Sequence, residues 1–447
     1  MDLPPISADP LDYALARLKT LGADGADGSV GASAALGIGV REGALETIER
    51  EEAISLSLRA FIGKRAASVS GSRLERNAID DMCERVIAMA QLAPEDPYGG
   101  LAAPDQLARD WPDLDLLDPD VPGPDQLRFE ALAAEDSARA QPKVAKSNGA
   151  NADWRLGHAF VAASNGFRGE LRQSSFGLSV SVVAGDGDGM ETDHAFDQAR
   201  RRRDLRSAEA IGVEAGLRVA ARLAPRRVET QRAAILYEPR LAQRLIGAFL
   251  NAITGTSVAR GVSFLRDKLG APVFSTAIDI IDDPLIPGGR GSRAFDGDGL
   301  ATSRQKLIEN GVLQTWLLNL TAGRQLGLAS KGHGVGGFGG ATGVGASNVL
   351  VSPGSETPSA LARFHGPCLL VTDMFSPSIN ATTGDYSAGV SGQWLLEGTP
   401  AFPVSEITIA GNLIEMFRTL IAASDLESRS TIQTPSLLIP EMAIGGA

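Results

Sequence analysis

The sequence of 447 residues predicts an α+β fold, with duplicated helix–β-meander–helix units in the N-terminal half and a β-rich C-terminal domain. Three observations support this class. Strand patterns occur in runs between helices, an order typical of α+β folds rather than of alternating βαβ sheets. A helix, a meander and a second helix occur in this order twice before residue 232. After Ala233, strand patterns and glycine turns predominate.

The first unit begins with a helix over residues 11–21, which Asp9-Pro10 starts and Gly22 ends. Its second helix, over residues 77–92, has apolar residues at helical spacing on one face. Alternating apolar residues between the helices predict strands over residues 36–41, 44–49, 53–62 and 65–70. A Pro- and Asp-rich stretch over residues 94–125 then predicts a long loop or linker.

The second unit repeats this order. Helices are predicted over residues 127–140 and 196–223, with strands over residues 143–147, 158–164 and 177–184. We therefore expect three domains, with bounds 1–125, 126–232 and 233–447.

A basic run at residues 200–203 lies near the predicted start of the helix over residues 196–223. Asp204, Glu209 and Glu214 follow it on that helix. The mixture of signs indicates a solvated face of salt bridges rather than a nucleic-acid site.

Composition excludes several classes of protein. Lys plus Arg is 42 and Asp plus Glu is 54, so the net charge of −12 argues against nucleic-acid and anionic-membrane partners. The apolar runs are far shorter than a bilayer span, and the N-terminus lacks the basic-then-apolar pattern of a signal peptide. Two distant cysteines, Cys83 and Cys368, fit a reducing compartment. We expect a cytoplasmic protein.

The most informative stretch of the chain lies near its C-terminus. Gly384-Asp385 indicates a turn, and residues 393–397 and 403–410 have strand character. Asn412 suits the N-cap of a following apolar-striped helix. The requirements of folding explain each of these features separately, but they do not explain the exact residues of the whole stretch.

This stretch resembles the C-terminal block of the TldD/PmbA family, and within it the PmbA (TldE) branch. The resemblance lies in Thr383-Gly-Asp-Tyr-Ser followed by Gly392-Gln-Trp-Leu-Leu-Glu-Gly. Three middle segments are similar as well: Glu309-Asn-Gly-Val-Leu, Trp316-Leu-Leu and Gly332-His-Gly. The resemblance follows the C-terminal half in order and the N-terminal half mainly in pattern.

The resemblance implies a subunit of a cytoplasmic metalloprotease built from two related chains. In this family the TldD chain holds zinc with a His-Glu-x-x-x-His helix and a late Cys, and the PmbA-like chain typically lacks that site. Here the helix over residues 240–253 has Ile246, Gly247 and Asn251 at the aligned positions and contains no histidine. Residues 429–442 contain no cysteine. We therefore expect no catalytic residue, metal ligand or cofactor in this chain, with zinc in a TldD-like partner.

A glycine pattern at residues 332–337 has the spacing of a dinucleotide site, but it follows a short predicted helix over residues 320–326 instead of a strand. It indicates a tightly turned or mobile loop over residues 332–345 ahead of a strand at 348–351. A substrate- or partner-facing loop is the alternative.

Other motifs also have plain structural explanations. Asp186-Gly-Asp-Gly and Asp296-Gly-Asp-Gly indicate turns, because the glutamate that closes a calcium loop is missing. Cys368, close to His365, is interpreted as a buried strand cysteine rather than half of a Cys-His pair. Ser387 lacks the flanking glycines of a nucleophile elbow.

Three functions of different classes stay open. The first is the non-zinc subunit of such a metalloprotease. The second is an independent hydrolase with a site outside the family motif. The third is a binding or regulatory protein, in line with the family's older label as a modulator of DNA gyrase. The missing zinc ligands favour the first function, and the acidic charge disfavours direct DNA binding.

The expected partners are a TldD-like zinc-bearing subunit, in a heterodimer or higher assembly, and unfolded peptides, with a homodimer left open. If residues 403–410 form an edge strand, their backbone could pair with an extended peptide. The candidate substrate- or partner-facing residues are Thr383, Gly384, Asp385, Tyr386, Ser387 and His333.

Overall fold

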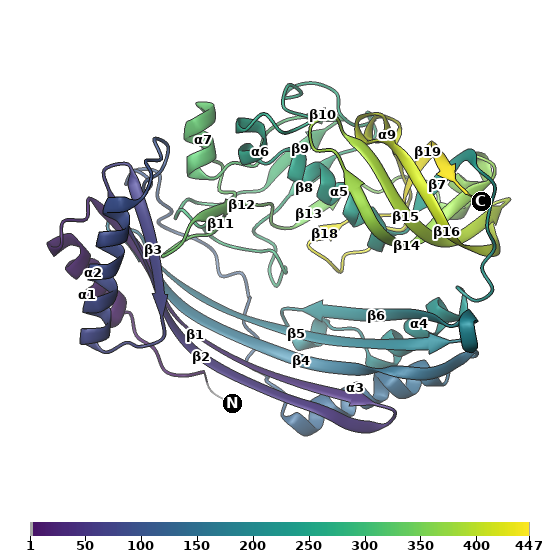
Figure 1. Ribbon diagram of the computed structural model, residues 1–447, viewed down its shortest axis with the longest axis horizontal. Helices are drawn as coiled ribbons and strands as arrows, with labels where there is room; N and C mark the ends of the chain where they lie inside the picture. The colour runs from purple at the N-terminus through teal and green to yellow at the C-terminus, as the bar shows by residue number, and fades with distance from the viewer. Residues whose placement is uncertain (1–2, 447) are drawn as a thin grey trace.

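The computed structural model describes residues 3–446 (Figure 1). The N-terminal half forms one long antiparallel sheet of six strands in the order β3-β2-β1-β4-β5-β6, seen across the lower part of Figure 1. Its strands are β1 (Gly25–Arg41), β2 (Ala44–Ile62), β3 (Arg65–Gly71), β4 (Val144–Ala163), β5 (Arg168–Ala184) and β6 (Glu191–Ala199).

The order of elements confirms the predicted duplication and the α+β class. Helices α1 (Asp9–Thr20) and α2 (Arg76–Leu92) flank β1 to β3, and α3 (Pro124–Arg139) and α4 (Ala208–Ala220) flank β4 to β6. The two units share one sheet because β1 pairs with β4 over fourteen positions, from residue 27 to residue 40.

Several predicted strands are too short. The predicted strands 44–49 and 53–62 are one strand, β2, and the predicted strands 143–147 and 158–164 are one strand, β4. In β2 the charged residues 49–52 are exposed and interrupt the apolar alternation. The backbone nevertheless stays paired with β1 throughout this stretch, so the strand continues.

The predicted helix over residues 196–223 is wrong at its start. Residues 191–199 form β6, and α4 begins only at Ala208, where the side chain of Ser207 accepts a hydrogen bond from the Ala210 amide at 3.2 Å. The basic run at 200–203 therefore lies in a loop with a short 3₁₀ turn, η2 (Arg202–Asp204). Its acidic partners include the linker residue Asp115, in addition to Asp204.

Helices α3 and α4 cover one face of the sheet, around the fully buried Trp154. They approach each other closely because Gly212 and Gly216 of α4 face α3. A Cβ atom at Gly212 would lie 2.3 Å from the carbonyl oxygen of Ala134. No residue larger than glycine fits there without moving the α3 backbone.

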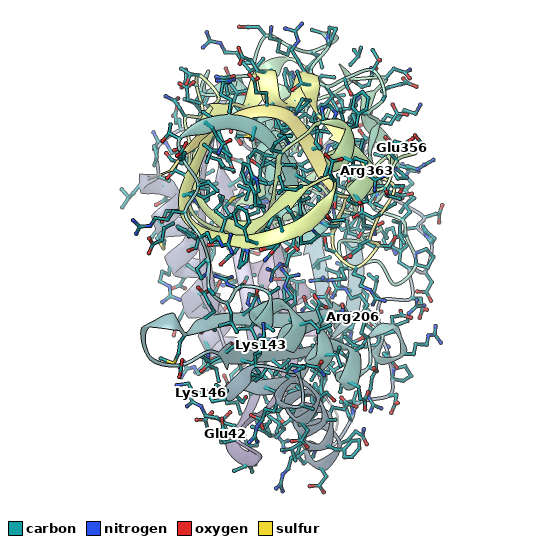
Figure 2. All side chains as sticks on the ribbon, turned by 90° about the vertical axis from the view of Figure 1, so that its right-hand side faces the viewer. Glu42, Lys143, Lys146, Arg206, Glu356 and Arg363 are labelled. Carbon is teal, nitrogen blue, oxygen red and sulfur yellow. The ribbon has the colours of Figure 1, made fainter. Side chains whose placement is uncertain are left out.

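The C-terminal half contains a sheet of six strands, five of which close into a ring that Figure 2 shows end-on. The order around the ring is β7, β14, β15, β16 and β19, with β14 parallel to β7 and the remaining neighbours antiparallel. Helix α5 (Pro239–Ala252) packs against the same hydrophobic core. The strands are β7 (Gln231–Tyr237), β14 (Cys368–Ile379), β15 (Asp385–Leu396), β16 (Thr399–Asn412) and β19 (Leu437–Gly445).

A second sheet of short strands, in the order β10-β9-β8-β13-β18, lies beside α5 in the same domain. Its strands are β8 (Ile280–Asp282), β9 (Gln305–Glu309), β10 (Val312–Leu313), β13 (Val349–Val351) and β18 (Ile432–Gln433). The remaining elements are α6 (Gly255–Ala259), α7 (Leu320–Leu326), the hairpin β11 (Gly334–Gly336) and β12 (Thr342–Val344), α8 (Pro358–Phe364), α9 (Leu413–Thr419), β17 (Ile421–Ala422) and η1 (Gly187–Gly189).

The glycine-rich loop over residues 332–345 links the two halves of the chain. The amide of Gly339 donates to the buried carboxylate of Asp27 at 2.7 Å, and Arg59 pairs with the same carboxylate. Phe338 stacks on Phe167, with 5.2 Å between ring centroids. A Cβ atom at Gly339 would lie 2.5 Å from the backbone of β2, so the loop requires glycine there.

Among the helices of residues 3–446, none combines the length and the apolar character needed to cross a bilayer.

Candidate functional site

The segment Thr383–Ser387 begins at a hydrogen-bonded turn between β14 and β15. The Thr383 hydroxyl donates to one oxygen of the Asp385 carboxylate at 2.6 Å. The side-chain amide of Asn412 donates to the other oxygen at 3.0 Å. Gly384 has a φ of +81°, a conformation that favours glycine. Thr383 and Asp385 are exposed, so this turn presents fixed polar groups to the solvent.

Asn412 joins this turn to helix α9. Its side-chain oxygen accepts from the Ile414 amide at 3.0 Å, which confirms the predicted N-cap. Its amide also donates to the Thr383 carbonyl at 3.0 Å. The hydrogen bonds from Thr383 and then Asn412 hold the pKa of Asp385 below its usual value. Asp385 is thus an ionised hydrogen-bond acceptor and not a proton-transfer group at neutral pH.

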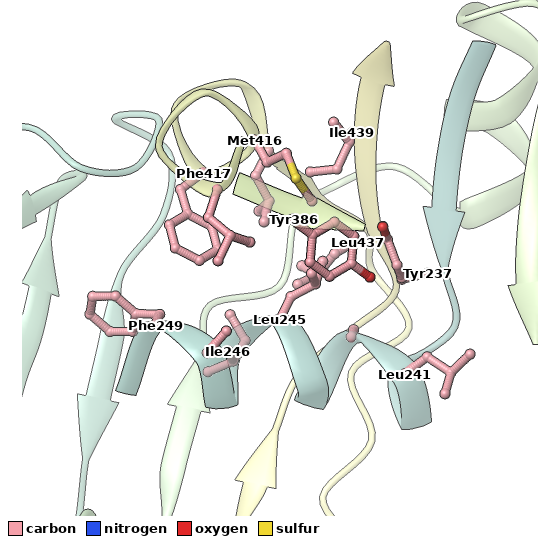
Figure 3. Close-up of a cluster of buried hydrophobic side chains, with 14 of the residues drawn as sticks. Tyr237, Leu241, Leu245, Ile246, Phe249, Tyr386, Met416, Phe417, Leu437 and Ile439 are labelled. Carbon is pink, nitrogen blue, oxygen red and sulfur yellow. The ribbon is translucent and has the colours of Figure 1, made fainter. Parts of the chain in front are cut away.

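Tyr386 points into the core, opposite to Asp385, because successive side chains alternate along a strand. It is 4% exposed, and its hydroxyl contacts the Met374 sulfur at 3.6 Å. Figure 3 shows it beside Tyr237 and above α5. Burial raises the pKa of Tyr386 to about 12. Ser387 is half-buried and lies opposite Ala410 of β16.

His333 lies apart from this turn, in the interior of the C-terminal domain. Its side chain is 1% exposed, and Nδ1 accepts from the Leu318 amide at 3.3 Å. Nε2 is 3.6 Å from a carboxylate oxygen of Asp282 and has no hydrogen-bond partner. Burial, followed by the positive charge of Arg293, lowers the pKa of His333 to about 3. In this conformation His333 is neutral and buried in the core.

Two buried groups give the stability of the fold opposite dependences on pH. The pKa of His333 is lowered from 6.5 to about 3, so its contribution is lost as the pH falls below 6.5. Burial, and then the charge of Asp298, raise the pKa of Asp296 from 3.8 to about 6. Folded Asp296 therefore holds a proton between pH 4 and 6 that the unfolded chain releases, and its contribution is lost as the pH rises.

We expect His333→Gln to remove the pH-dependent contribution of His333 to stability and to leave that of Asp296. Between pH 4 and 6, the slope of unfolding free energy against pH should fall by about 1.4 kcal/mol per pH unit relative to the unsubstituted chain, the value for one proton. Urea unfolding at several pH values measures this slope. Equal slopes for the two proteins would show that His333 titrates normally in the folded chain.

Helix α5 carries the positions aligned with the zinc motif. Ile246 is fully buried, Gly247 has no side chain, and Asn251 is exposed (Figure 3 shows Ile246). Zinc is held by imidazole nitrogens, thiolates or carboxylates. An aliphatic chain, a hydrogen and an amide do not fit a zinc ion. Among residues 3–446, no group of three or more His, Cys, Asp or Glu side chains is placed to hold a metal.

Two motifs prove to be structural. Asp296 is 1% exposed and accepts from the amides of Asp298, Leu300 and Gly334 at 2.9 to 3.0 Å, so it organises a turn as predicted. Cys368 is buried at the start of β14, and burial raises the pKa of its thiol to about 12. Such a thiol is inert as a nucleophile at neutral pH.

Sequence reasoning missed an ionic network that joins α4 to the C-terminal domain. Arg218 donates to Glu238 at 2.6 Å, and Arg222 donates to Asp373 at 2.8 Å. Both arginines also lie within 4 Å of the buried carboxylate of Asp193 in β6. The available signal was their spacing of four residues near the end of the predicted helix, although α4 ends at Ala220 and Arg222 lies just beyond it.

Two open polar cavities flank the basic run. One, of about 600 Å³, lies between residues 201–208 and the acidic linker at 115–120. The other, of about 540 Å³, lies between the end of β6 and the loops at 286–290 and 426–430. Each cavity contains both arginines and carboxylates, so neither selects an ion of one sign.

The strand over residues 403–410 is an edge only in part. It belongs to β16, which pairs with β15 on one side and with β19 through Thr408–Ala410 on the other. The carbonyl of Pro403 also accepts from the Arg226 amide at 2.8 Å. Within residues 3–446 only the short stretch 405–407 has no strand on its outer side, so a peptide could not pair along the whole strand.

Comparison with protein families identifies three matching segments. Residues 230–446 match the PmbA/TldA metallopeptidase C-terminal domain. Residues 117–223 match the central domain of the same group, and residues 27–90 match its domain 1.

Individual relatives agree over nearly the whole chain. It is 33% identical to "Metalloprotease PmbA" from Escherichia coli O157:H7 over 425 residues, covering 95% of this chain and 92% of that protein. It is 34% identical to "Metalloprotease PmbA homolog" from Haemophilus influenzae, covering 96% and 94%. The fold is similar to the crystal structure of TldE from Thermococcus kodakarensis, with a TM-score of 0.85, 19% identity, and coverage of 98% and 100%.

Proposed function

The chain belongs to the PmbA/TldD metallopeptidase family, and from this we propose that it is the PmbA/TldE-like, non-zinc subunit of a cytoplasmic peptide-degrading metalloprotease. A TldD-like partner would hold the zinc that activates water for hydrolysis. The observation that carries the proposal is the chemistry of α5, where Ile246, Gly247 and Asn251 stand at the aligned positions of the zinc motif.

The contribution of this chain would be to bind and orient. The Thr383–Asp385 turn supports this role because its exposed groups are held by hydrogen bonds before any ligand arrives. Such preorganisation lowers the entropy lost on binding. An ionised Asp385 carboxylate can accept hydrogen bonds from the amides of an unfolded peptide or of the partner subunit.

We expect the purified chain to hold no stoichiometric zinc and to cleave no peptide by itself. Peptide cleavage should appear when the zinc-bearing partner is added. Elemental analysis and chromatography of an unfolded peptide substrate measure the two quantities. The proposal fails if the chain alone retains about one tightly bound zinc whose removal by a chelator also removes peptidase activity.

In the mixture with the partner, we expect Asp385→Ala to lower kcat/KM for peptide cleavage roughly tenfold, about 1.4 kcal/mol of transition-state binding. Tyr386→Phe should stay within about twofold, since the buried ring is retained. Glu415→Ala, an exposed acid on neighbouring α9, is the control. Melting temperature and complex formation are measured for each variant. Normal cleavage by Asp385→Ala, or loss only through unfolding or failed assembly, would make the turn purely structural.

A further inference from the structure

Strand β2 has a long unpaired edge. One side of β2 pairs with β1 along its whole length, whereas β3 pairs with the other side only over residues 56–62. Within residues 3–446 no strand pairs with that side of residues 44–55. Residues 44–53 are exposed, so neither a helix nor a loop covers this stretch. In Figure 1, β2 runs along the lower margin of the molecule.

The sequence of this edge has approximate two-fold symmetry about Glu51. It reads Thr47-Ile-Glu-Arg-Glu-Glu-Ala-Ile-Ser, so chemically matched residues lie at equal distances from the centre. Thr47 matches Ser55, and Ile48 matches Ile54. Arg50 stands where Glu52 stands on the other side. When two identical strands pair antiparallel about an axis through Glu51, each residue faces its counterpart on the same face of the sheet.

We propose that two copies of this chain pair through residues 47–55 of β2, joining two six-stranded sheets into one. Within one chain Arg50 pairs with Glu52 on the same face of β2. In this register Arg50 of each copy also lies opposite Glu52 of the other, so the four side chains form two further ion pairs across the strands. Ile48, 58% exposed in one chain, lies opposite Ile54 of the other, again twice. Both kinds of pair stabilise neighbouring antiparallel strands.

These contacts fall on the same face of the sheet as the hydrophobic core beside α3. Ile48 and Arg50 lie opposite Ile38 and Leu36 of β1, which are buried on the side that α3 covers. The only like-charge pair, Glu51 with Glu51 of the second copy, lies on the opposite face. There water screens the repulsion.

Charged residues on an edge strand usually prevent pairing. Here the neighbouring symmetric registers do bring like charges together: an axis at Arg50 sets Glu49 against Glu51 twice. An axis at Ile48 would instead need Glu46 as the partner of Arg50. Glu46 lies in a β-bulge, where the register with β1 shifts, and is poorly placed to continue a ladder. The axis at Glu51 is thus the register that the charges favour.

The edge is also rigid and limited at both ends. Pairing would stop at Leu56, where the pairing of β2 with β3 begins, and at the bulge near Glu46. The adjoining β1–β2 turn is held by the fully buried Glu135 of α3, which accepts from the amides of Glu42 and Gly43 at 2.9 and 2.8 Å. Little conformational entropy would therefore be lost on pairing.

A cysteine cross-link tests the register. Opposed Cβ atoms lie about 4.5–5.5 Å apart, close to the span of a disulfide. Under mild oxidation Glu51→Cys should give a covalent dimer on a non-reducing gel. Glu49→Cys, on the same face but opposite Ala53, should give little. Cys83 and Cys368 are buried and add no background. Equal cross-linking by the two variants would overturn the register.

Charge exchange tests the interface itself. By light scattering over a dilution series, the unsubstituted chain should be a dimer. Arg50→Glu should weaken the dimer roughly tenfold or more, since two attractions become two repulsions. Arg50→Glu with Glu52→Arg should restore it. A monomeric chain, or a dimer that Arg50→Glu leaves unchanged, would overturn the proposal. So would a covalent dimer of Glu51→Cys that appears only when a zinc-bearing partner is present. None of these measurements uses a peptidase assay, so their outcome is independent of the proposed function.

Discussion

Introducing the zinc motif into α5, by Ile246→His with Gly247→Glu and Asn251→His, is expected to unfold the C-terminal domain rather than create a zinc site. Ile246 is fully buried in the largest hydrophobic core of the chain. Removing its side chain and burying an imidazole together cost roughly 3–6 kcal/mol. A typical domain has only about 5–15 kcal/mol of stability. The substitution at residue 246 is therefore expected to cause most of the loss of stability in the triple variant.

The double variant Gly247→Glu with Asn251→His is the matched control. A Cβ atom at Gly247 would meet nothing within 4 Å, and Asn251 is exposed. This variant should unfold within about 1 kcal/mol of the original chain, the usual range for surface changes. Urea midpoints and zinc content are measured for both variants. A triple variant that is stable and binds one zinc per chain would show that α5 can turn residue 246 towards a metal.

The second large effect is expected at the crossing of α3 and α4. Gly212→Ala would place its Cβ 2.3 Å from the Ala134 carbonyl oxygen, and a backbone atom cannot move aside cheaply. We expect a loss of roughly 2–4 kcal/mol and a lower melting temperature for the N-terminal half.

Gly247→Ala makes the same chemical change in the middle of α5, where the added methyl group meets open space. Alanine loses less backbone entropy on folding than glycine, so this variant should gain up to about 1 kcal/mol. Calorimetry of the two variants compares the sites directly. Equal melting temperatures would mean that α3 and α4 separate easily and that the close contact is not needed.

Local sequence patterns predicted those helices and strands whose start, end and apolar face can be recognised from their own residues. Helix α5 begins at Pro239 and has a continuous apolar stripe, and Asn412 caps α9 through its own side chain. Strand β2 was predicted in fragments because its charged residues 49–52 are all exposed and lack an apolar face. Strand β4 was also predicted in fragments, although its middle has a buried apolar face of Ala150, Ala152, Trp154 and Leu156. Their backbones are held by pairing with β1, which no local window contains.

The candidate site divides in the same way. The turn residues Thr383 and Asp385 contact each other, so their role could be inferred from adjacent residues. Whether Tyr386 and His333 face solvent or core depends on strands and loops far along the chain. Arg218 pairs with Glu238, and Arg222 pairs with Asp373, which lies 151 positions later in the chain. This network forms only where the two halves of the protein meet.

By itself, the sequence determined the α+β class, the duplication, and the kinds of side chain that α5 presents at the aligned zinc-motif positions. These depend on residue identity and on the short periods of helix and strand. Only the tertiary structure decided that both units share one sheet, that β16 lies inside a closed ring, and that the edge of β2 stays unpaired. Long-range pairing selects among strands with similar local patterns, and that choice depends on which distant backbone is available to hydrogen-bond.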